Sequence, residues 1–223
     1  MDERENKVFE QFLNTVIHEL KTPVNEIRFL SEFVEEDNVG RLKEQSVEDL
    51  GSIRKTCDAM IDMIKDLLDY SKSQTAEVES APVQMRGMVN QYYTNMTRML
   101  PKDSMTLTFG EMVDVMADHR LMKNVIKNIL SNSVKYRRNH VEGKIHVSCV
   151  MRDNMVEYHF QDNGIGFDQK HAKQILEPFV RLHNEEEYEG NGLGLALVHR
   201  VLTLLDGDIQ VSSIEGKGTT FTV

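Results

Sequence analysis

Apolar residues recur every three or four positions through the first third of the chain. One stripe runs from Phe9 to Val34 and a second runs from Val47 to Leu68, with the polar segment 37–44 between them. This spacing is typical of two amphipathic helices joined by a turn. Two such helices bury too little surface alone. We therefore expect a second copy of the chain to complete a four-helix bundle and form a homodimer.

The helical period stops in the segment 73–82, whose small, polar and proline residues suit a linker. Helical and strand-like patterns then mix. Helices are expected at about 86–100, 121–135 and 193–205, and strands at 105–109, 113–117, 144–151, 155–162, 208–213 and 219–223. This mixture predicts an α plus α/β architecture. Residues 1–76 would form the helical dimerisation domain, residues 77–82 a linker and residues 83–223 an α/β domain.

Charge and composition exclude several classes of protein. The formal net charge is -10, whereas nucleic-acid binders usually carry a basic footprint. No apolar run approaches the roughly 18 to 20 residues of a membrane span, so we expect a soluble cytoplasmic piece without membrane contact. The two cysteines, Cys57 and Cys149, lie in different regions and predict neither a disulfide nor a zinc site.

The first helix carries a candidate nucleophile. His18 lies two residues from both Val16 and Leu20, a spacing that turns it away from the apolar stripe and towards solvent. Glu19 is adjacent, and Thr22 follows one helical turn later. An exposed imidazole is a competent nucleophile when a carboxylate manages its proton. An ordinary surface histidine is the alternative for His18 alone, because the chain has eight histidines.

A helix in the second domain combines groups that suit a nucleotide. Asn128, Asn132, Lys135 and Tyr136 fall at helical spacings and can share one face. Carboxamide oxygens suit Mg²⁺, and a lysine can neutralise phosphate charge. A polar helix face with asparagines by chance is the alternative.

Three glycine-containing segments could complete such a site. In DNGIGF, Asp162 could accept a hydrogen bond from an exocyclic amine, and Gly164 and Gly166 permit close approach. GNGLGL precedes a helix whose N-terminal amides favour phosphate, and GKGTTF offers the hydroxyl of Thr219. Each segment alone is equally compatible with a simple turn, so the argument depends on their joint occurrence.

The run FLNTVIHELKTPVNEI and these motifs, in this order, resemble the catalytic core of two-component sensor histidine kinases. The segment from EPFVRLH to LALVHR is most similar to phytochrome-type kinases. The resemblance implies an α/β sandwich ATP-binding domain of the gyrase, chaperone and mismatch-repair ATPase superfamily. It also implies ATP and Mg²⁺ as cofactors, and a response-regulator receiver domain as the partner.

The resemblance also implies roles for individual residues. His18 would be phosphorylated, Glu19 would be its acid/base partner and Thr22 would position water for a phosphatase reaction. Asn132 would bind Mg²⁺. The remaining residues of the implied nucleotide site are Asn128, Lys135, Tyr136, Asp162, Gly164, Gly166, Phe179, Arg181, Gly190, Gly192, Gly194, Leu195 and Thr219. Ser133 stands where alanine is usual, and Leu176 where an aromatic residue is common.

Three other functions fit the same motifs. A phosphatase-biased kinase and a dimeric nucleotide-binding scaffold remain open, although the intact motifs weigh against the scaffold. A stand-alone ATPase is disfavoured, because hydrolytic members of the superfamily have a glutamate base where this chain has Asn128. An amide cannot deprotonate an attacking water.

Overall fold

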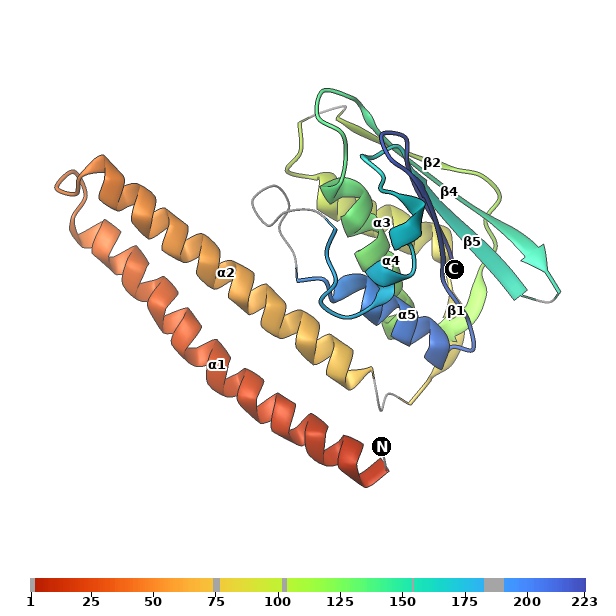
Figure 1. The fold of residues 1–223 in the computed structure, drawn as a ribbon, viewed down its shortest axis with the longest axis horizontal. Coiled ribbons are helices and arrows are strands. Elements are labelled where there is room, and N and C mark those ends of the chain that lie inside the picture. The colour runs from red at the N-terminus through yellow and green to blue at the C-terminus, as the bar shows by residue number, and fades with distance from the viewer. Residues whose placement is uncertain (1–2, 74–76, 102–103, 154, 183–190) are drawn as a thin grey trace. The chain divides into compact units, whose positions relative to one another are not determined.

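The computed structural model describes residues 3–73, 77–101, 104–153, 155–182 and 191–223, except for the side chains of residues 3–16, 18 and 19. The chain divides into two compact units, one containing residues 1–75 and the other most of residues 76–223. Figure 1 shows the helices and strands of each unit.

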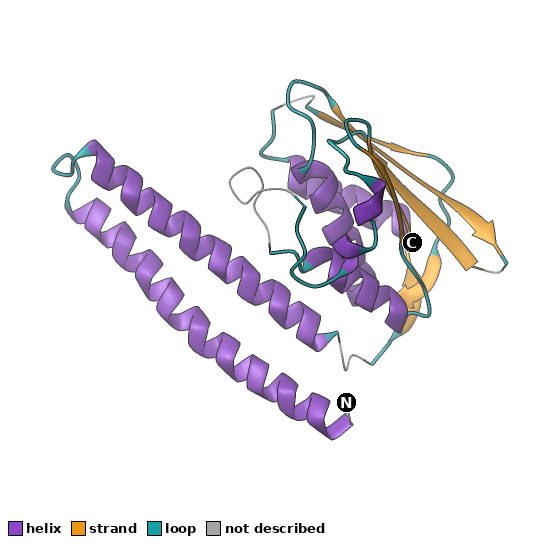
Figure 2. Cartoon of the chain, viewed as in Figure 1, coloured by secondary structure: helices purple, strands orange, loops and turns teal. Residues whose placement is uncertain are grey.

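The first unit is a helical hairpin, as the sequence predicts. Helix α1 spans Glu3–Asp37 and helix α2 spans Glu44–Lys72. The two helices run side by side and are joined by a short turn (Figure 2). The side chains buried between them recur every seven residues, at positions 17, 24 and 31 of α1 and positions 57, 64 and 71 of α2. This period keeps one face of each helix against its neighbour.

The single buried stripe expected on the first helix is in fact two stripes. Ile17 and Val24 are buried inside the hairpin, whereas Leu20, Ile27 and Val34 are exposed in the single chain. The two sets differ by three residues, which rotates the second set towards an adjacent face. The sequence pattern merged them because both sets are apolar.

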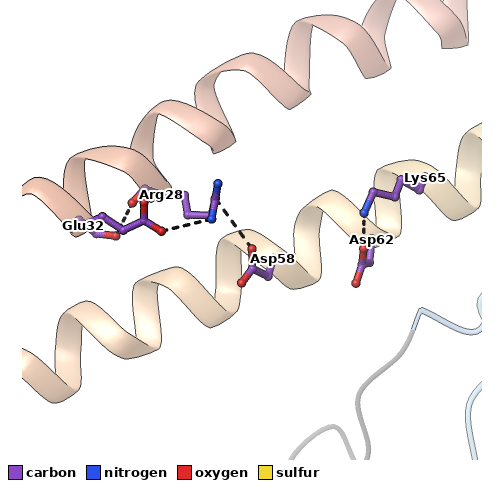
Figure 3. Close-up of polar contacts among 6 residues, drawn as sticks. Arg28, Glu32, Asp58, Asp62 and Lys65 are labelled. Atoms are coloured by element: carbon purple, nitrogen blue, oxygen red, sulfur yellow. Dashed lines mark hydrogen bonds and ion pairs between the residues drawn. The ribbon is translucent and has the colours of Figure 1, made fainter. Parts of the chain in front are cut away.

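Ion pairs also cross the hairpin. Arg28 on α1 contacts Glu32 on the same helix at 3.2 Å and Asp58 on α2 at 4.0 Å (Figure 3). Further along, Arg54 on α2 pairs with Glu35 on α1 at 2.5 Å. Partly exposed pairs of this kind contribute about 1 kcal/mol or less each. The Arg28–Asp58 and Arg54–Glu35 pairs each link a position on α1 to a position on α2.

The second unit contains a five-stranded sheet with the order β2-β4-β5-β7-β6 and a two-stranded sheet of β1 and β3. Strands β2 and β4 are parallel, and the other neighbours are antiparallel. The strands are β1 (Ser80–Val83), β2 (Met105–Phe109), β3 (Val115–Asp118), β4 (Gly143–Arg152), β5 (Met155–Asp162), β6 (Gln210–Ile214) and β7 (Gly218–Thr222). The helices are α3 (Met85–Thr97), α4 (His119–Lys135) and α5 (Gly194–Leu204), with 3₁₀ turns at Gln169–His171 and Gln174–Leu176.

Helices α3, α4 and α5 lie on one face of the five-stranded sheet (Figure 1). That face is a row of buried side chains: Val147 pairs with Phe160, which pairs in turn with Phe221. Opposite them, α4 buries Ile126, Ile129 and four other apolar residues. This α/β sandwich confirms the predicted fold class. Among the described residues, no helix is long and apolar enough to cross a membrane.

Strand β1 was not predicted. Residues 80–82, which the sequence places in a linker, pair with residues 116–118 of β3. Pro82 and the polar residues before it hid the strand, because proline is confined to strand edges and starts. Cys57 and Cys149 are buried free thiols, as expected.

Candidate functional site

Helix α4 presents the predicted asparagine motif. Its start is fixed by Asp118, whose carboxylate accepts hydrogen bonds from the amides of Arg120 and Leu121. Further along, the Asn128 side chain donates to the Asn124 carbonyl at 2.8 Å, which orients its carboxamide. Asn132 is half-buried one turn later.

The end of α4 carries a lysine and a tyrosine in contact. Lys135 Nζ lies 2.8 Å from Tyr136 Oη and 4.4 Å from the centroid of its ring. Burial raises the pKa of the Tyr136 hydroxyl, while the positive charge of Arg181 opposes that rise. This tyrosine stays a neutral hydrogen-bonding group near neutral pH, with the positive charge of Lys135 against it.

Asp162, at the end of β5, is held by three hydrogen bonds. Its Oδ1 accepts from the amides of Gly164 at 2.8 Å and Thr219 at 3.1 Å, and its Oδ2 lies 3.3 Å from Ser133 Oγ. Burial raises the pKa of this carboxyl, and the three hydrogen bonds oppose the shift. A buried carboxylate with one oxygen saturated by amides can offer its other oxygen to a donor on a ligand.

Glycines let the chain close tightly around Asp162. A Cβ on Gly164 would lie 2.6 Å from the carbonyl oxygen of Tyr136. A Cβ on Gly218 would lie 2.0 Å from the carbonyl oxygen of Asp162. Gly166 and Gly218 also have positive φ angles, which non-glycine residues rarely adopt. The DNGIGF and GKGTTF turns therefore pack backbone against backbone, and the predicted glycines are needed where they stand.

The start of α5 meets the asparagine helix. A Cβ on Gly194, the first residue of α5, would lie 2.6 Å from Asn128 Oδ1. The preceding glycine, Gly192, accepts a hydrogen bond at its carbonyl from the amide of Phe179 at 3.0 Å. Phe179 has a φ of 65° and is 64% exposed. The structure thus brings Gly192 and Gly194, the EPF segment and Asn128 together.

The other predicted residues lie in different settings. Thr219 is buried and its hydroxyl is 2.9 Å from Ser213 Oγ, and Leu195 is half-buried in the first turn of α5. Thr22 is exposed on α1 in the first unit. His18 and Glu19 lie on α1, but their side chains are outside the described ones, as is all of Gly190.

Sequence reasoning missed the residues that hold the Asp162 turn in place. Ser133 contacts Asp162 directly, although in the sequence it is marked only by standing where alanine is usual. Arg138 donates to the carbonyls of Asn163 and Gly216, which ties the two glycine turns together. No motif signals these contacts, because each joins segments distant in sequence.

The arrangement suits a phosphorylated ligand. The amides and dipole at the start of α5 favour an anion, and Lys135 adds a positive charge. Among the described residues, no three histidine, cysteine, aspartate or glutamate side chains gather to hold a metal ion. The carboxamides of Asn128 and Asn132 nevertheless suit Mg²⁺, which takes few protein ligands and completes its shell with water and phosphate oxygens.

Two family models match the chain. The phosphoacceptor domain of histidine kinases, His Kinase A, matches residues 10–76, and the "Histidine kinase-, DNA gyrase B-, and HSP90-like ATPase" family matches residues 117–223. The chain is 29% identical, over 94% of its length, to hybrid signal transduction histidine kinase B of Dictyostelium discoideum, and 26% identical over 98% to phytochrome-like protein Cph1 of Synechocystis. It spans only 11% and 29% of those two proteins.

Solved structures share the fold. Full-length ShkA, determined in complex with AMPPNP, aligns with 95% of this chain and 44% of its own at a TM-score of 0.73 and 23% identity. The histidine kinase AdeS of Acinetobacter baumannii aligns with 92% of this chain and 96% of its own at a TM-score of 0.62 and 21% identity. At these identities the structures support the fold alone.

Proposed function

The chain belongs to the histidine kinases, as the catalytic core of a sensor histidine kinase; from this premise we propose that it transfers the γ-phosphoryl group of Mg-ATP to His18. The group then passes to an aspartate on the receiver domain of a response regulator. The ATP-binding domain match and the AMPPNP bound to the related ShkA support ATP as the nucleotide.

In the proposed reaction, a ring nitrogen of His18 attacks the γ-phosphorus in line with the bond to the β,γ-bridging oxygen. The P–N bond forms as the P–O bond breaks, and ADP leaves. Glu19 takes the proton from the imidazole. Lys135 and the amides at the start of α5 hold the phosphates, and Asp162 accepts a hydrogen bond from the adenine amine.

Asn132 would hold Mg²⁺, with Asn128 supporting the metal or a phosphate. When bound, the ion neutralises charge on the phosphate oxygens. The observation that carries the proposal is the position of Asn128, whose carboxamide oxygen lies against Gly194 at the start of α5. A carboxylate there could activate water, but this amide cannot. Attack by a histidine from the first unit is therefore the reaction this site favours.

The test is incubation of the purified chain with Mg²⁺ and γ-labelled ATP. We expect acid-labile, alkali-stable label in the parent and none in His18→Ala. His199→Ala, an exposed histidine of α5, is the matched control and should label like the parent. ATP binding, measured by calorimetry, should be equal in all three. Label that persists in His18→Ala would contradict the proposal.

The receiver would dock along the stripe of α1 that contains His18. With about 3.6 residues per turn, positions 18, 22, 29 and 33 fall along one side of a helix. Phe29 and Phe33 are 48% and 57% exposed. Two exposed aromatic side chains on this stripe would supply the apolar contact that a receiver needs when it reaches His18. This partner surface rests on the proposed function.

Phe33→Glu tests the docking surface apart from the kinase reaction. We expect autophosphorylation at the parental rate, and transfer slowed about tenfold or more to purified receiver domains that accept phosphate from the parent. Equal transfer rates for Phe33→Glu and the parent would exclude this surface.

The same helix supports a phosphatase reaction. Thr22 is exposed one turn after His18, where its hydroxyl could position the water that attacks a phosphorylated receiver. Thr22→Ala should therefore slow dephosphorylation of the receiver while leaving autophosphorylation unchanged.

A further inference from the structure

Ser133 is the one hydroxyl on α4 that reaches the Asp162 carboxylate among the described residues. It is buried, with 3% of its surface exposed, and its Oγ lies 3.3 Å from both Asp162 Oδ2 and the Ile129 carbonyl oxygen. A serine has a single hydroxyl proton, so these two acceptors share it. The Ile129 contact is local to the helix, but the contact with Asp162 joins α4 to the end of β5.

The two oxygens of Asp162 have different tasks. Oδ1 accepts hydrogen bonds from the backbone amides of Gly164 and Thr219, which use both of its lone pairs. Within the described part of the chain, Oδ2 accepts a hydrogen bond from the Ser133 hydroxyl and keeps a lone pair for another donor. A donor from α4 therefore acts together with the two amides on Oδ1 to fix the direction in which Oδ2 faces.

We propose that Ser133 is a positioning residue for base recognition: it holds Asp162 so that Oδ2 accepts the exocyclic amine of adenine and disfavours a base with a carbonyl at that position. The inference deepens the proposed function and rests on Asp162 facing the base. A purine with a 6-carbonyl would place an acceptor against a carboxylate oxygen, and two acceptors repel.

In the sequence, Ser133 stands out only as a serine where alanine is usual. In the fold, the hydroxyl instead partly satisfies a buried carboxylate that burial alone would push towards its neutral form. A neutral carboxyl is a poorer acceptor for an amine, so Ser133 keeps Asp162 in the form that adenine needs.

The experiment compares ATP with inosine triphosphate, which has a carbonyl in place of the amine. Both affinities are measured by calorimetry in the full 223-residue chain. The His18→Ala background prevents phosphorylation during the titration. Ser133→Ala should weaken ATP binding by roughly two- to tenfold, the range for one hydrogen bond, with little change for inosine triphosphate. The selectivity ratio should fall by the same factor.

Three comparisons separate this role from simple packing. Ser131→Ala, an exposed serine on the same helix, should leave both affinities unchanged. Ser133→Cys keeps the size but donates more weakly, so its selectivity should lie between serine and alanine. The pH below which ATP affinity falls should rise in Ser133→Ala, because the Asp162 carboxyl loses a donor.

Equal weakening of both nucleotides by Ser133→Ala would identify a packing defect and overturn the inference. An unchanged selectivity ratio and pH profile would overturn it as well. If the parent binds neither nucleotide, both the proposed function and the inference about Ser133 fail. If the parent binds ATP without labelling His18, the kinase proposal fails, while the selectivity measurement still decides the role of Ser133.

Discussion

At the scale of single residues, Asp162 shows a conflict between binding and stability. Its carboxyl is largely buried and its pKa is raised by that burial, so ionising it in the folded chain costs free energy. The three donors around it recover part of this cost. A site that needs a buried carboxylate for its ligand carries that penalty in the empty protein.

Asp162→Asn should separate the two effects. The amide oxygen can still accept from Gly164 and Thr219, and the amide nitrogen can donate to Ser133 Oγ, so the turn stays intact. We expect the free energy of unfolding at pH 7 to stay equal or to rise by up to about 1 kcal/mol, because no charge is buried. ATP binding should be lost. A fall of several kcal/mol in urea unfolding would contradict this reading.

The glycines near this carboxylate predict a second contrast. Gly164→Ala places a methyl group 2.6 Å from the Tyr136 carbonyl oxygen, so the turn must shift and ATP affinity should fall more than tenfold. Gly51→Ala is the matched control, because nothing lies within 4 Å of its Cβ on α2. That change should stabilise the helix by about 0.5 to 1 kcal/mol. Calorimetric titration and urea unfolding measure the two effects. Unimpaired ATP binding in Gly164→Ala would show that the turn has no such restriction.

The sequence predicts which residue types gather at the site but not how they touch. The glycine motifs could be found because each is local and ordered along the chain. The approach of Gly194 to Asn128 and of Ser133 to Asp162 joins segments dozens of residues apart. Such contacts depend on how helices and strands pack, and no spacing in a single sequence reports that.

At the scale of elements, α4 depends on the carboxylate that begins it. The Asp118 carboxylate accepts hydrogen bonds from the amides of Glu79, Arg120 and Leu121. It also accepts one from the Arg120 side chain. Burial raises the pKa of this carboxyl, but these donors outweigh it and lower the pKa to about 2. The same side chain thus caps α4 and anchors the backbone just before β1.

Asp118→Ala should destabilise the chain by about 1 to 2 kcal/mol, the range for losing an N-cap. The parent's advantage should be fully present above the ordinary pKa of 3.8 and disappear as the pH falls towards 2, because a depressed carboxyl stabilises only while ionised. Urea unfolding between pH 2 and pH 7 measures the difference. Asp168→Ala, which removes the cap of a single exposed turn, should change stability much less. If the difference in unfolding free energy between the parent and Asp118→Ala were the same at pH 2 as at pH 7, the ionised Asp118 carboxylate would not be its source.

Periodicity predicted the long helices well, since α1 and α2 are amphipathic over many turns. It failed for β1, whose four residues include Pro82 and which exists only through pairing with β3. Short strands carry too few residues to show a period, and their stability comes from the partner strand. The predicted strand at 113–117 is displaced for the same reason, since β3 begins at Val115.

At the scale of the whole molecule, the hairpin has an apolar face that the single chain leaves exposed. Leu20, Ile27 and Val34 on α1 recur at intervals of seven, as do Ile53 and Met60 on α2. A second hairpin packed on this face would bury both rows as knobs in a four-helix bundle. The same period on both helices therefore favours the proposed homodimer.

Ile27 and Phe29 provide a matched pair for the last prediction. Their side chains are 50% and 48% exposed, yet at about 100° per residue they face nearly opposite directions on α1. Ile27→Glu should convert the dimer to a monomer, because a buried carboxylate without a partner costs several kcal/mol. Phe29→Glu should remain dimeric but transfer phosphate slowly to a receiver. Light scattering across a dilution series and phosphotransfer assays measure the two properties.

Ile27→Glu loses the dimer and Phe29→Glu loses fast phosphotransfer only if dimerisation and receiver docking use separate faces of α1. Circular dichroism should show equal helix content in both, which excludes unfolding as the cause. If Phe29→Glu also dissociates the dimer, the His18 stripe forms part of the interface, and the receiver must dock elsewhere. If Ile27→Glu stays dimeric, the seven-residue rows do not form the interface. Ile27 and Phe29 have nearly the same exposure but lie on opposite sides of α1. The Ile27→Glu result therefore tests one face of the helix for dimerisation, and the Phe29→Glu result tests the other face for receiver docking.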